Sequence, residues 1–466
     1  MRTSPYTVLS NHPFVDSDGD VVRVVMNTAT GRVFTLPARV SEQLAAGALS
    51  DITGGLDALI GAGLVIDGDA FASAVAAYQD AAKHRTRSFV LMPTAACNFD
   101  CGYCGQVNER QSWSDVQVRQ LIARIEAAAR SGRFAAISVG WFGGEPLMGY
   151  RRMQEVSRAA IDACTEYGLK YHAKIVTNGS LLDARRLHEL HVQMRVETIE
   201  ITIDGPSGQH DLLRPAKSGQ GTHTRIVDVL RLLTTDEQLT GMSAVVRTNI
   251  SRRNRHSANR FAQEMTAAGL GDERVSFYPS PVRNWGNDVS AVGLSRTEAV
   301  ETEIEWMTAY LDHGLHCTVI PTARPAPVCI AVDPTAEVVA PDGHLYACSE
   351  QPLVPDRGAD SVGHLDTHQS VRATSEFDGW VPTNEMACAQ CAVYPLCGGR
   401  CPLAWREGAT PCPVLRDSLP RRLDLYARTT GLAPRASRTG PLDCSCVVDT
   451  GKRRDVVQPF VIRQGA

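Results

Sequence analysis

Six β-rich runs alternate with amphipathic stretches between about residues 87 and 320, and this alternation constrains the fold more than any other feature of the chain. Strands separated by helical crossovers lie parallel in one sheet. The stretch 115–130 is a clear helix candidate because Ser114 stands at its N-cap position. The sequence therefore predicts an α/β domain over 86–320, with strands at 88–92, 136–141, 172–176, 197–203, 242–248 and 274–279.

Three cysteines follow the first of these runs. Cys97, Cys101 and Cys104 have the spacing C-x3-C-x2-C. Three thiolates at that spacing can bind three corners of one 4Fe–4S cluster and leave the fourth iron open, whereas clusters that only carry electrons usually have four cysteine ligands. The alternatives are a zinc knuckle, although zinc prefers C-x2-C pairs and a fourth ligand, or cysteines buried without a role.

The triplet resembles the cysteine motif of the radical S-adenosylmethionine (radical SAM) superfamily. In that superfamily the open iron chelates SAM, and one electron cleaves SAM to a 5′-deoxyadenosyl radical. The resemblance implies a partial (β/α)6 barrel whose active site lies at the carboxyl ends of the strands, as in closed barrels. A non-catalytic Fe–S or zinc scaffold is the alternative of a different class, and it would not need a SAM pocket.

Further motifs at predicted strand ends match those that bind SAM in this family. The second strand leads into a G-G-E-P turn, the third ends in T-N-G, and the fourth ends in T-I-D-G-P. An arginine ten residues after the last motif suits a carboxylate, although a surface salt bridge explains it equally well. Packing would likewise explain the aromatic residue before the third cysteine. The SAM-binding residues that the resemblance implies are Tyr103, Gly143, Gly144, Glu145, Thr177, Asn178, Thr202, Asp204 and Arg214.

A second cysteine array lies in the loop-rich segment 321–430. Fourteen cysteines favour metal over disulfides, because they cluster and the reducing compartment expected for this chain disfavours disulfides. Cys329, Gly343 and Cys348 have the spacing C-x13-G-x4-C, and the array continues as C-x2-C-x5-C-x3-C from Cys388 to Cys401, followed by Cys412. This pattern resembles the seven-cysteine SPASM domain, which holds two auxiliary 4Fe–4S clusters. The resemblance assigns Cys388, Cys391, Cys397 and Cys412 to an outer cluster, and Cys329, Cys348 and Cys401 to an inner one.

The inner set lacks a fourth ligand. Either Cys317 completes it, or one iron is open and could bind a substrate atom, and the open site is slightly favoured. Cys444 and Cys446 in the tail 431–466 could contribute, but the family pattern does not require them and a flexible tail is the simpler reading.

The sequence of residues 1–85 predicts a small winged-helix-like domain. Two β-rich runs at 21–26 and 32–36 form a hairpin signal, and helical patterns near 37–46 and 52–62 follow. The order loosely resembles the peptide-recognition domains of enzymes that modify ribosomally made peptides, and a structural extension is the alternative. A leader peptide would bind there by strand addition to the hairpin edge.

These resemblances imply a peptide maturase that takes hydrogen from a side chain of a precursor peptide and installs a crosslink or related oxidative modification. Glu350, shortly after Cys348, is a candidate proton acceptor, and a solvated surface glutamate is the alternative. Sulfatase maturases, which form formylglycine, usually carry an aspartate where this chain has Ser349. That departure argues against formylglycine formation.

Composition limits the partners and the compartment. A net charge of -4 gives no reason to expect nucleic acid as a partner. The chain has no run of about 18 apolar residues that would span a membrane, and its first residues lack the apolar core of a signal peptide. We therefore expect a cytoplasmic protein, and the family resemblance implies a flavodoxin or ferredoxin as electron donor.

Overall fold

The computed structural model describes residues 1–434, apart from 53, 82–84, 285, 325–326, 356, 368–370 and 385, and also residues 448–449. The described residues fall into two compact units. The first unit comprises the described residues of 1–83, 318–329 and 380–449, and the second comprises those of 84–317 and 330–379. Among the described residues, no helix has both the length and the apolar character that a membrane crossing requires.

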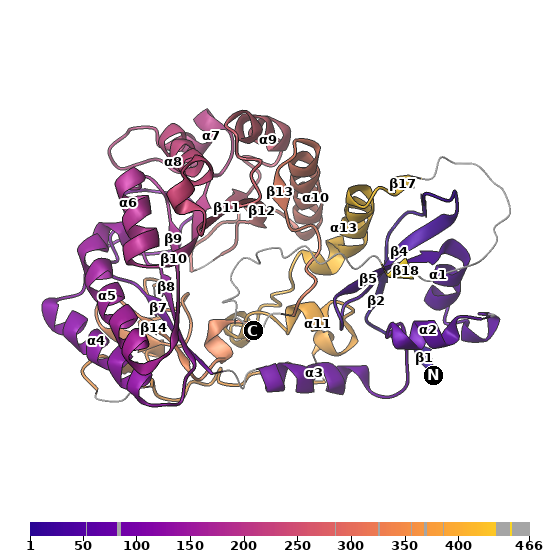
Figure 1. Ribbon diagram of the computed structural model, residues 1–466, viewed down its shortest axis with the longest axis horizontal. Helices are drawn as coiled ribbons and strands as arrows, with labels where there is room; N and C mark the ends of the chain where they lie inside the picture. The colour runs from indigo at the N-terminus through magenta and orange to yellow at the C-terminus, as the bar shows by residue number, and fades with distance from the viewer. Residues whose placement is uncertain are drawn as a thin grey trace. The chain divides into compact units, whose positions relative to one another are not determined.

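A curved, mostly parallel sheet forms the centre of the second unit (Figure 1). Its first six strands confirm the six predicted runs, and the following short strand continues the parallel order. A later strand pairs in parallel with the first, and two antiparallel strands extend that edge. The strands are β7 (Thr86–Leu91), β8 (Ala136–Trp141), β9 (Lys170–Thr177), β10 (Val196–Thr202), β11 (Ser243–Ile250), β12 (Val275–Pro281), β13 (His316–Cys317), β14 (Ala336–Val339), β15 (His344–Tyr346) and β16 (Gly363–His364).

Helices follow most of these strands and cover the outer face of the sheet (Figure 1). They are α4 (Asp115–Arg130), α5 (Tyr150–Tyr167), α6 (Ala184–His188), α7 (Ser207–Leu213), α8 (His223–Thr235), α9 (Ala258–Ala267) and α10 (Arg296–Asp312). The predicted cap of α4 is confirmed. Ser114 Oγ accepts from the Gln117 amide, and the Gln117 side chain accepts from the Ser114 amide. This reciprocal pair satisfies two amides that the first turn leaves without partners.

The two faces of the parallel sheet differ in chemistry. Ile175, Ile199 and Phe277 belong to the apolar core that packs against the helices. Successive side chains of a strand point to opposite faces, so their strand neighbours Lys174, Glu200 and Tyr278 lie on the inner face. The inner face of this barrel is therefore polar, whereas closed barrels fill it with branched apolar side chains.

A buried ion triad of Arg87, Arg124 and Glu337 links β14 to the first strand and first helix of the barrel. The fully buried Glu337 carboxylate lies 2.7 Å from the nearest nitrogens of both Arg87 and Arg124. Burial alone would raise the pKa of Glu337, but the two guanidinium groups hold it below its usual value. Because β14 pairs with β7, this triad joins the segment that carries Cys348 to the first strand.

The first unit contains the predicted N-terminal hairpin and the two helices that follow it. Two short strands pair with the first hairpin strand, and a short strand after the second helix pairs with the first residues of the chain. A further helix follows that the sequence did not predict. The elements are β1 (Arg2–Thr3), β2 (Thr7–Leu9), β3 (Phe14–Val15), β4 (Val21–Asn27), β5 (Arg32–Pro37), α1 (Ala38–Ala45), α2 (Leu56–Gly61), β6 (Val65–Ile66) and α3 (Ala70–Ala81).

The same unit includes the cysteine-rich segment. It contains α11 (Tyr394–Cys397), α12 (Pro402–Arg406), α13 (Leu415–Thr429), β17 (Ala433–Pro434) and β18 (Val448–Asp449). The Tyr78 hydroxyl at the end of α3 donates to the Pro395 carbonyl at 2.9 Å, and its ring packs against Tyr394 with centroids 5.7 Å apart. Residues 1–81 thus support the backbone between the cysteines of this segment.

Candidate active site

The cysteine triplet lies on the loop that follows β7. Cys97 and Cys101 are partly buried free thiols, and Cys104 is an exposed one. Burial raises the pKa of Cys101 to about 11, and it also raises the pKa of Cys97. The three thiols lie close enough for their charges to affect one another. The structure therefore brings the predicted triplet together at the carboxyl end of the first strand.

The spacing of the cysteines bears on the zinc alternative. In the part of the chain that the structure describes, no three His, Cys, Asp or Glu side chains are arranged to hold a metal ion. A zinc ion needs its sulfur ligands to converge about 2.3 Å from one point. A four-iron cube binds each cysteine at a separate corner and keeps the sulfurs farther apart. The C-x3-C-x2-C spacing of the sequence favours a cluster, because zinc sites prefer C-x2-C pairs and a fourth ligand.

The G-G-E-P turn after β8 packs directly on the start of the cysteine loop. A Cβ atom at Gly144 would lie 2.5 Å from the carbonyl oxygens of both Ala95 and Ala96, and Gly143 has a φ of +121°. The Glu145 amide donates to the Ala96 carbonyl at 2.8 Å. Only glycine fits at these two positions, so the turn allows the cysteine loop to pack closely against the end of β8.

Glu145 is fully buried and ties two predicted motifs together. Its carboxylate accepts from the Thr177 hydroxyl and the Asn178 amide, each at 2.7 Å, and from the Leu147 amide at 3.1 Å. Burial raises the pKa of Glu145, and these three bonds oppose that shift. A carboxylate has about four acceptor positions, so three are used here and one is left for a ligand donor.

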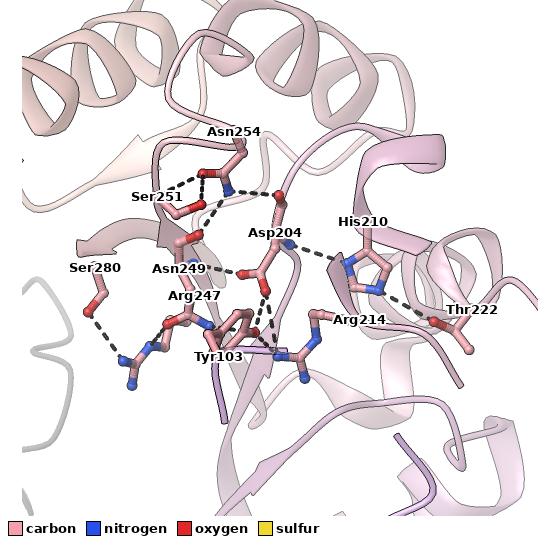
Figure 2. Close-up of polar contacts among 10 residues, drawn as sticks. All are labelled: Tyr103, Asp204, His210, Arg214, Thr222, Arg247, Asn249, Ser251, Asn254 and Ser280. Atoms are coloured by element: carbon pink, nitrogen blue, oxygen red, sulfur yellow. Dashed lines mark hydrogen bonds and ion pairs between the residues drawn. The ribbon is translucent and has the colours of Figure 1, made fainter. Parts of the chain in front are cut away.

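A network centred on Asp204 lies beyond the end of β10 (Figure 2). Asp204 is fully buried, and its carboxylate accepts from the Asn249 amide at 2.7 Å and from the Tyr103 hydroxyl. Its own amide donates to His210, and its carbonyl accepts from Asn254 at 2.9 Å. Burial raises the pKa of Asp204, whereas Arg214 and the hydrogen bond from the Tyr103 hydroxyl lower it. The network holds Tyr103, one residue before Cys104, against the strand ends.

Arg214 joins this network and is buried, so the alternative of a surface salt bridge does not describe it. One of its terminal nitrogens donates to the Tyr103 hydroxyl and lies 3.6 Å from Asp204. Burial opposes its charge, but Cys101, Tyr103 and Asp204 hold its pKa well above the usual value. Its Nε is buried without a hydrogen-bond partner among the described residues. Such a donor suits an acceptor supplied by a ligand, so the residues present fit an anionic group.

Glu350 lies near the polar inner face of the barrel. Its side chain is partly buried, which raises its pKa, and the nearby charges of Arg247 and Arg357 oppose the shift. Arg247 in β11 donates from Nε to the Asn249 side chain at 2.9 Å, and Asn249 in turn donates to the Tyr103 hydroxyl at 3.0 Å. Side-chain contacts thus run from the Asp204 network to the surroundings of Glu350.

Sequence reasoning missed Glu200 and Tyr278 on the inner face of the sheet. Tyr278 donates its hydroxyl to Glu200 at 2.9 Å, and Arg247 lies 4.0 Å from the same carboxylate. Burial raises the pKa of Tyr278, and Glu200 raises it further. The signal that could have found them is the regular placement of charged residues inside otherwise apolar strands.

The four predicted ligands of the outer cluster surround one pocket of the first unit. Cys388, Cys391, Cys397 and Cys412 line it together with Tyr394, Trp405 and Arg416. Burial, followed by the charges of the other three thiols, raises the pKa of Cys388 to about 12. The structure therefore brings together four cysteines that are spread over 25 positions of the sequence.

The predicted inner set stays a prediction. Cys329 and Cys401 belong to the first unit, and Cys348 to the second. Cys317 lies in β13 and packs against the apolar core of the barrel, which supports a packing role. Cys444 and Cys446 lie outside the described residues.

Comparisons with known proteins agree with this geometry. Residues 91–235 match the family model of the radical SAM superfamily. The uncharacterized protein sll1766 of Synechocystis sp. is 27% identical over 152 residues, which are 30% of this chain and 35% of that protein. The chain thus matches about a third of the length of this curated relative.

Solved structures show a similar fold. Native anSMEcpe with bound AdoMet and Kp18Cys peptide has a TM-score of 0.55 at 16% identity, covering 74% of this chain and 97% of that one. Streptococcus suis SuiB bound to precursor peptide SuiA has a TM-score of 0.49 at 13% identity, covering 87% and 97%. The anSMEcpe likeness shows a shared fold, and the family match adds the motifs. Residues 91–235 of the chain are therefore similar to the radical SAM superfamily in sequence, and the sheet that contains them has the fold of anSMEcpe.

Proposed function

We propose that the chain is a radical SAM/SPASM peptide maturase. It would take hydrogen from a side chain of a ribosomally made precursor peptide and install an oxidative modification such as a crosslink. The observation that carries this proposal is the cysteine triplet beside a buried network whose Arg214 Nε has no partner among the described residues. A scaffold has no need of an anion-binding position next to its cysteines.

The residues of the first site divide the work of holding cluster and SAM. Cys97, Cys101 and Cys104 would bind the cluster, and SAM bound to it would supply the 5′-deoxyadenosyl radical. Arg214 would pair with the SAM carboxylate, and the remaining acceptor position of Glu145 would receive the SAM amino group. The other residues proposed to contact SAM are Tyr103, Gly143, Gly144, Thr177, Asn178, Thr202 and Asp204.

Glu350 is the proposed proton acceptor. Joining two substrate atoms after hydrogen abstraction releases one proton and one electron. A carboxylate whose pKa is raised by burial takes up a proton more readily near neutral pH than an ordinary one. Arg247 and Arg357 keep part of its charge, so Glu350 can still be ionised before the reaction. The electron would pass to the auxiliary clusters and then to an external one-electron carrier.

A peptide substrate is supported by the N-terminal sheet of the first unit. Residues 448–449 of the chain pair antiparallel with Phe34 and Thr35, so the edge of β5 has the geometry to take an added strand. A leader peptide would use the same backbone groups. The proposed setting is cytoplasmic, with a flavodoxin or ferredoxin as electron donor.

Formylglycine formation of the sulfatase-maturase type is less favoured. Ser349 follows Cys348 where those enzymes usually carry an aspartate, and Glu350 is one position further on. The proton acceptor proposed here therefore stands one position later in the sequence than the aspartate of those enzymes.

Anaerobically reconstituted protein tests the proposal. With dithionite as reductant, wild-type protein should convert SAM to 5′-deoxyadenosine, measured by chromatography. The Cys97/Cys101/Cys104→Ala variant should lose this activity, and Cys164→Ala, which changes a core cysteine of α5, should keep it. Wild-type protein that binds iron but does not cleave SAM would contradict the catalytic proposal.

A further inference from the structure

We propose that Arg416 raises the reduction potential of the cluster held by Cys388, Cys391, Cys397 and Cys412. This inference rests on the proposed function, because it requires an iron–sulfur cluster in the pocket of the first unit. It concerns the residues around the sulfurs, which the ligand pattern alone does not specify.

Arg416 contacts one of the four cysteines directly. Its Nη1 lies 3.3 Å from Cys412 Sγ, and it lines the same pocket as the cysteines. Its Nε is held by the neighbouring Asp417 carboxylate at 2.9 Å, which orients the guanidinium group. Arg416 stands in the first turn of α13, where the helix dipole disfavours a cation. Its position there is therefore better explained by the sulfur than by the helix.

The turn between Cys397 and Cys401 acts in the same direction. Gly398, Gly399 and Arg400 have φ values of +60°, +83° and +64°. This left-handed run directs the Gly399 amide to the Cys397 sulfur and places the Arg400 charge near it. Arg400 is held in a conformation that costs a non-glycine residue energy, as residues at functional sites often are.

The first cysteine site has different neighbours. At the first site the Phe99 amide donates to Cys97 Sγ at 3.5 Å, and Arg214 lies 3.6 Å from the buried Asp204 carboxylate. Adding an electron makes a cluster more negative. Cations and N–H donors at the sulfurs therefore raise its potential, and nearby carboxylates lower it. The guanidinium group of Arg416, in direct contact with Cys412 Sγ, should therefore raise the potential of the outer cluster.

A raised reduction potential suits a cluster that accepts an electron. A substrate radical that is oxidised by one electron reduces the outer cluster by one electron. An external oxidised one-electron carrier then has to remove that electron before the next turnover. Arg416 is exposed at the surface of the unit, so the group that tunes the potential also lies where a carrier could approach.

The test is a redox titration in the Cys97/Cys101/Cys104→Ala background, which removes the first cluster. Electron paramagnetic resonance follows the auxiliary clusters, and Cys412→Ser identifies the signal that belongs to the outer one. Arg416→Gln should lower the midpoint potential of that signal, and Arg416→Lys should lower it less because the charge is kept. Arg421→Gln, five residues along α13, makes the same charge change and should leave the potential where it was.

Two outcomes would overturn the inference, and they are distinguishable. If Arg416→Gln keeps about eight irons per chain and the midpoint potential does not move, Arg416 does not tune the cluster and only this inference fails. If the background protein holds no cluster that Cys412→Ser perturbs, the auxiliary-cluster part of the proposed function fails as well.

Discussion

The two cysteine sites of this chain are assembled in different ways. The triplet at 97–104 lies on one loop, but the groups that surround it come from the ends of several strands: Glu145 after β8, Asp204 after β10 and Asn249 in β11. The outer pocket is built almost entirely from residues 387–416 of the chain. The first site thus depends on the barrel being correctly formed, whereas the second depends on local turns and on their support by Tyr78 and its neighbours.

The largest effect is expected from Asp204→Ala. It removes the acceptor of Tyr103 and Asn249 and leaves Arg214 buried beside no counter-charge. The free energy of unfolding should fall by about 3–5 kcal/mol in urea titrations. SAM cleavage should fall by about 100-fold or more in protein that remains folded, because the cysteine loop loses its support. Asp228→Asn, in an exposed pair with Arg231, should change stability by no more than about 0.5 kcal/mol. Equal effects of the two variants would contradict the central role of Asp204.

Glu350→Gln should separate product formation from SAM cleavage. We expect product formation to fall by about 100- to 10,000-fold, the usual contribution of a general base, with 5′-deoxyadenosine still released. In the wild type, product formation should rise with pH through the raised pKa of Glu350, because the carboxylate must be ionised to accept a proton. The variant should lack this rise. As a control, Glu301→Gln on the exposed side of α10 should behave like wild type.

Glycine substitutions should disable the two sites one at a time. Gly144→Ala places a Cβ against the Ala95 and Ala96 carbonyls and should abolish SAM cleavage while the outer cluster stays. Gly399→Ala places a Cβ 2.4 Å from Pro382 and should lose about four irons per chain, the content of one cluster. Gly408→Ala has a similar φ of +75° but meets no atom within 4 Å. It should cost only about 1–2 kcal/mol of stability and retain iron. If Gly408→Ala also loses iron, the positive φ that both glycines share would explain the loss, and the close contact of Gly399 with Pro382 would not be its cause.

The smallest effect is expected from Cys317→Ser. Because Cys317 packs against the barrel core, the substitution should cost about 1 kcal/mol of stability and leave the iron content unchanged. Loss of iron would instead make Cys317 the fourth ligand of the inner cluster and end the proposal of an open iron there.

Much of the barrel could be predicted because its signals are local. The six strands, the Ser114 cap and the hairpin at 21–36 each follow from periodicity and turn residues. β14 could not be predicted as part of the sheet, because its pairing of Ala336 with Ser88 joins positions 248 residues apart in a short strand. The ion triad of Glu337 depends on that same long-range pairing.

The site shows the same division. Cysteine spacing and the motifs at strand ends name residues that lie near the first triplet and that line the outer pocket, because those patterns are set by chemistry within a few positions. The partners of Arg214 and the charged inner face with Glu200 and Tyr278 arise from strand register, which single-sequence patterns leave open. The contact of Tyr78 with the Tyr394 turn arises from packing within the first unit.

The most direct test of two separate cluster sites is iron and sulfide per chain in three anaerobically reconstituted proteins. We expect about twelve irons in the wild type, about eight in Cys97/Cys101/Cys104→Ala, and about eight in Cys388/Cys391/Cys397→Ala. Only the first variant should lose SAM cleavage, since the second changes a site in the other unit. Four irons or fewer in the wild type, or equal loss of SAM cleavage in both variants, would contradict the account.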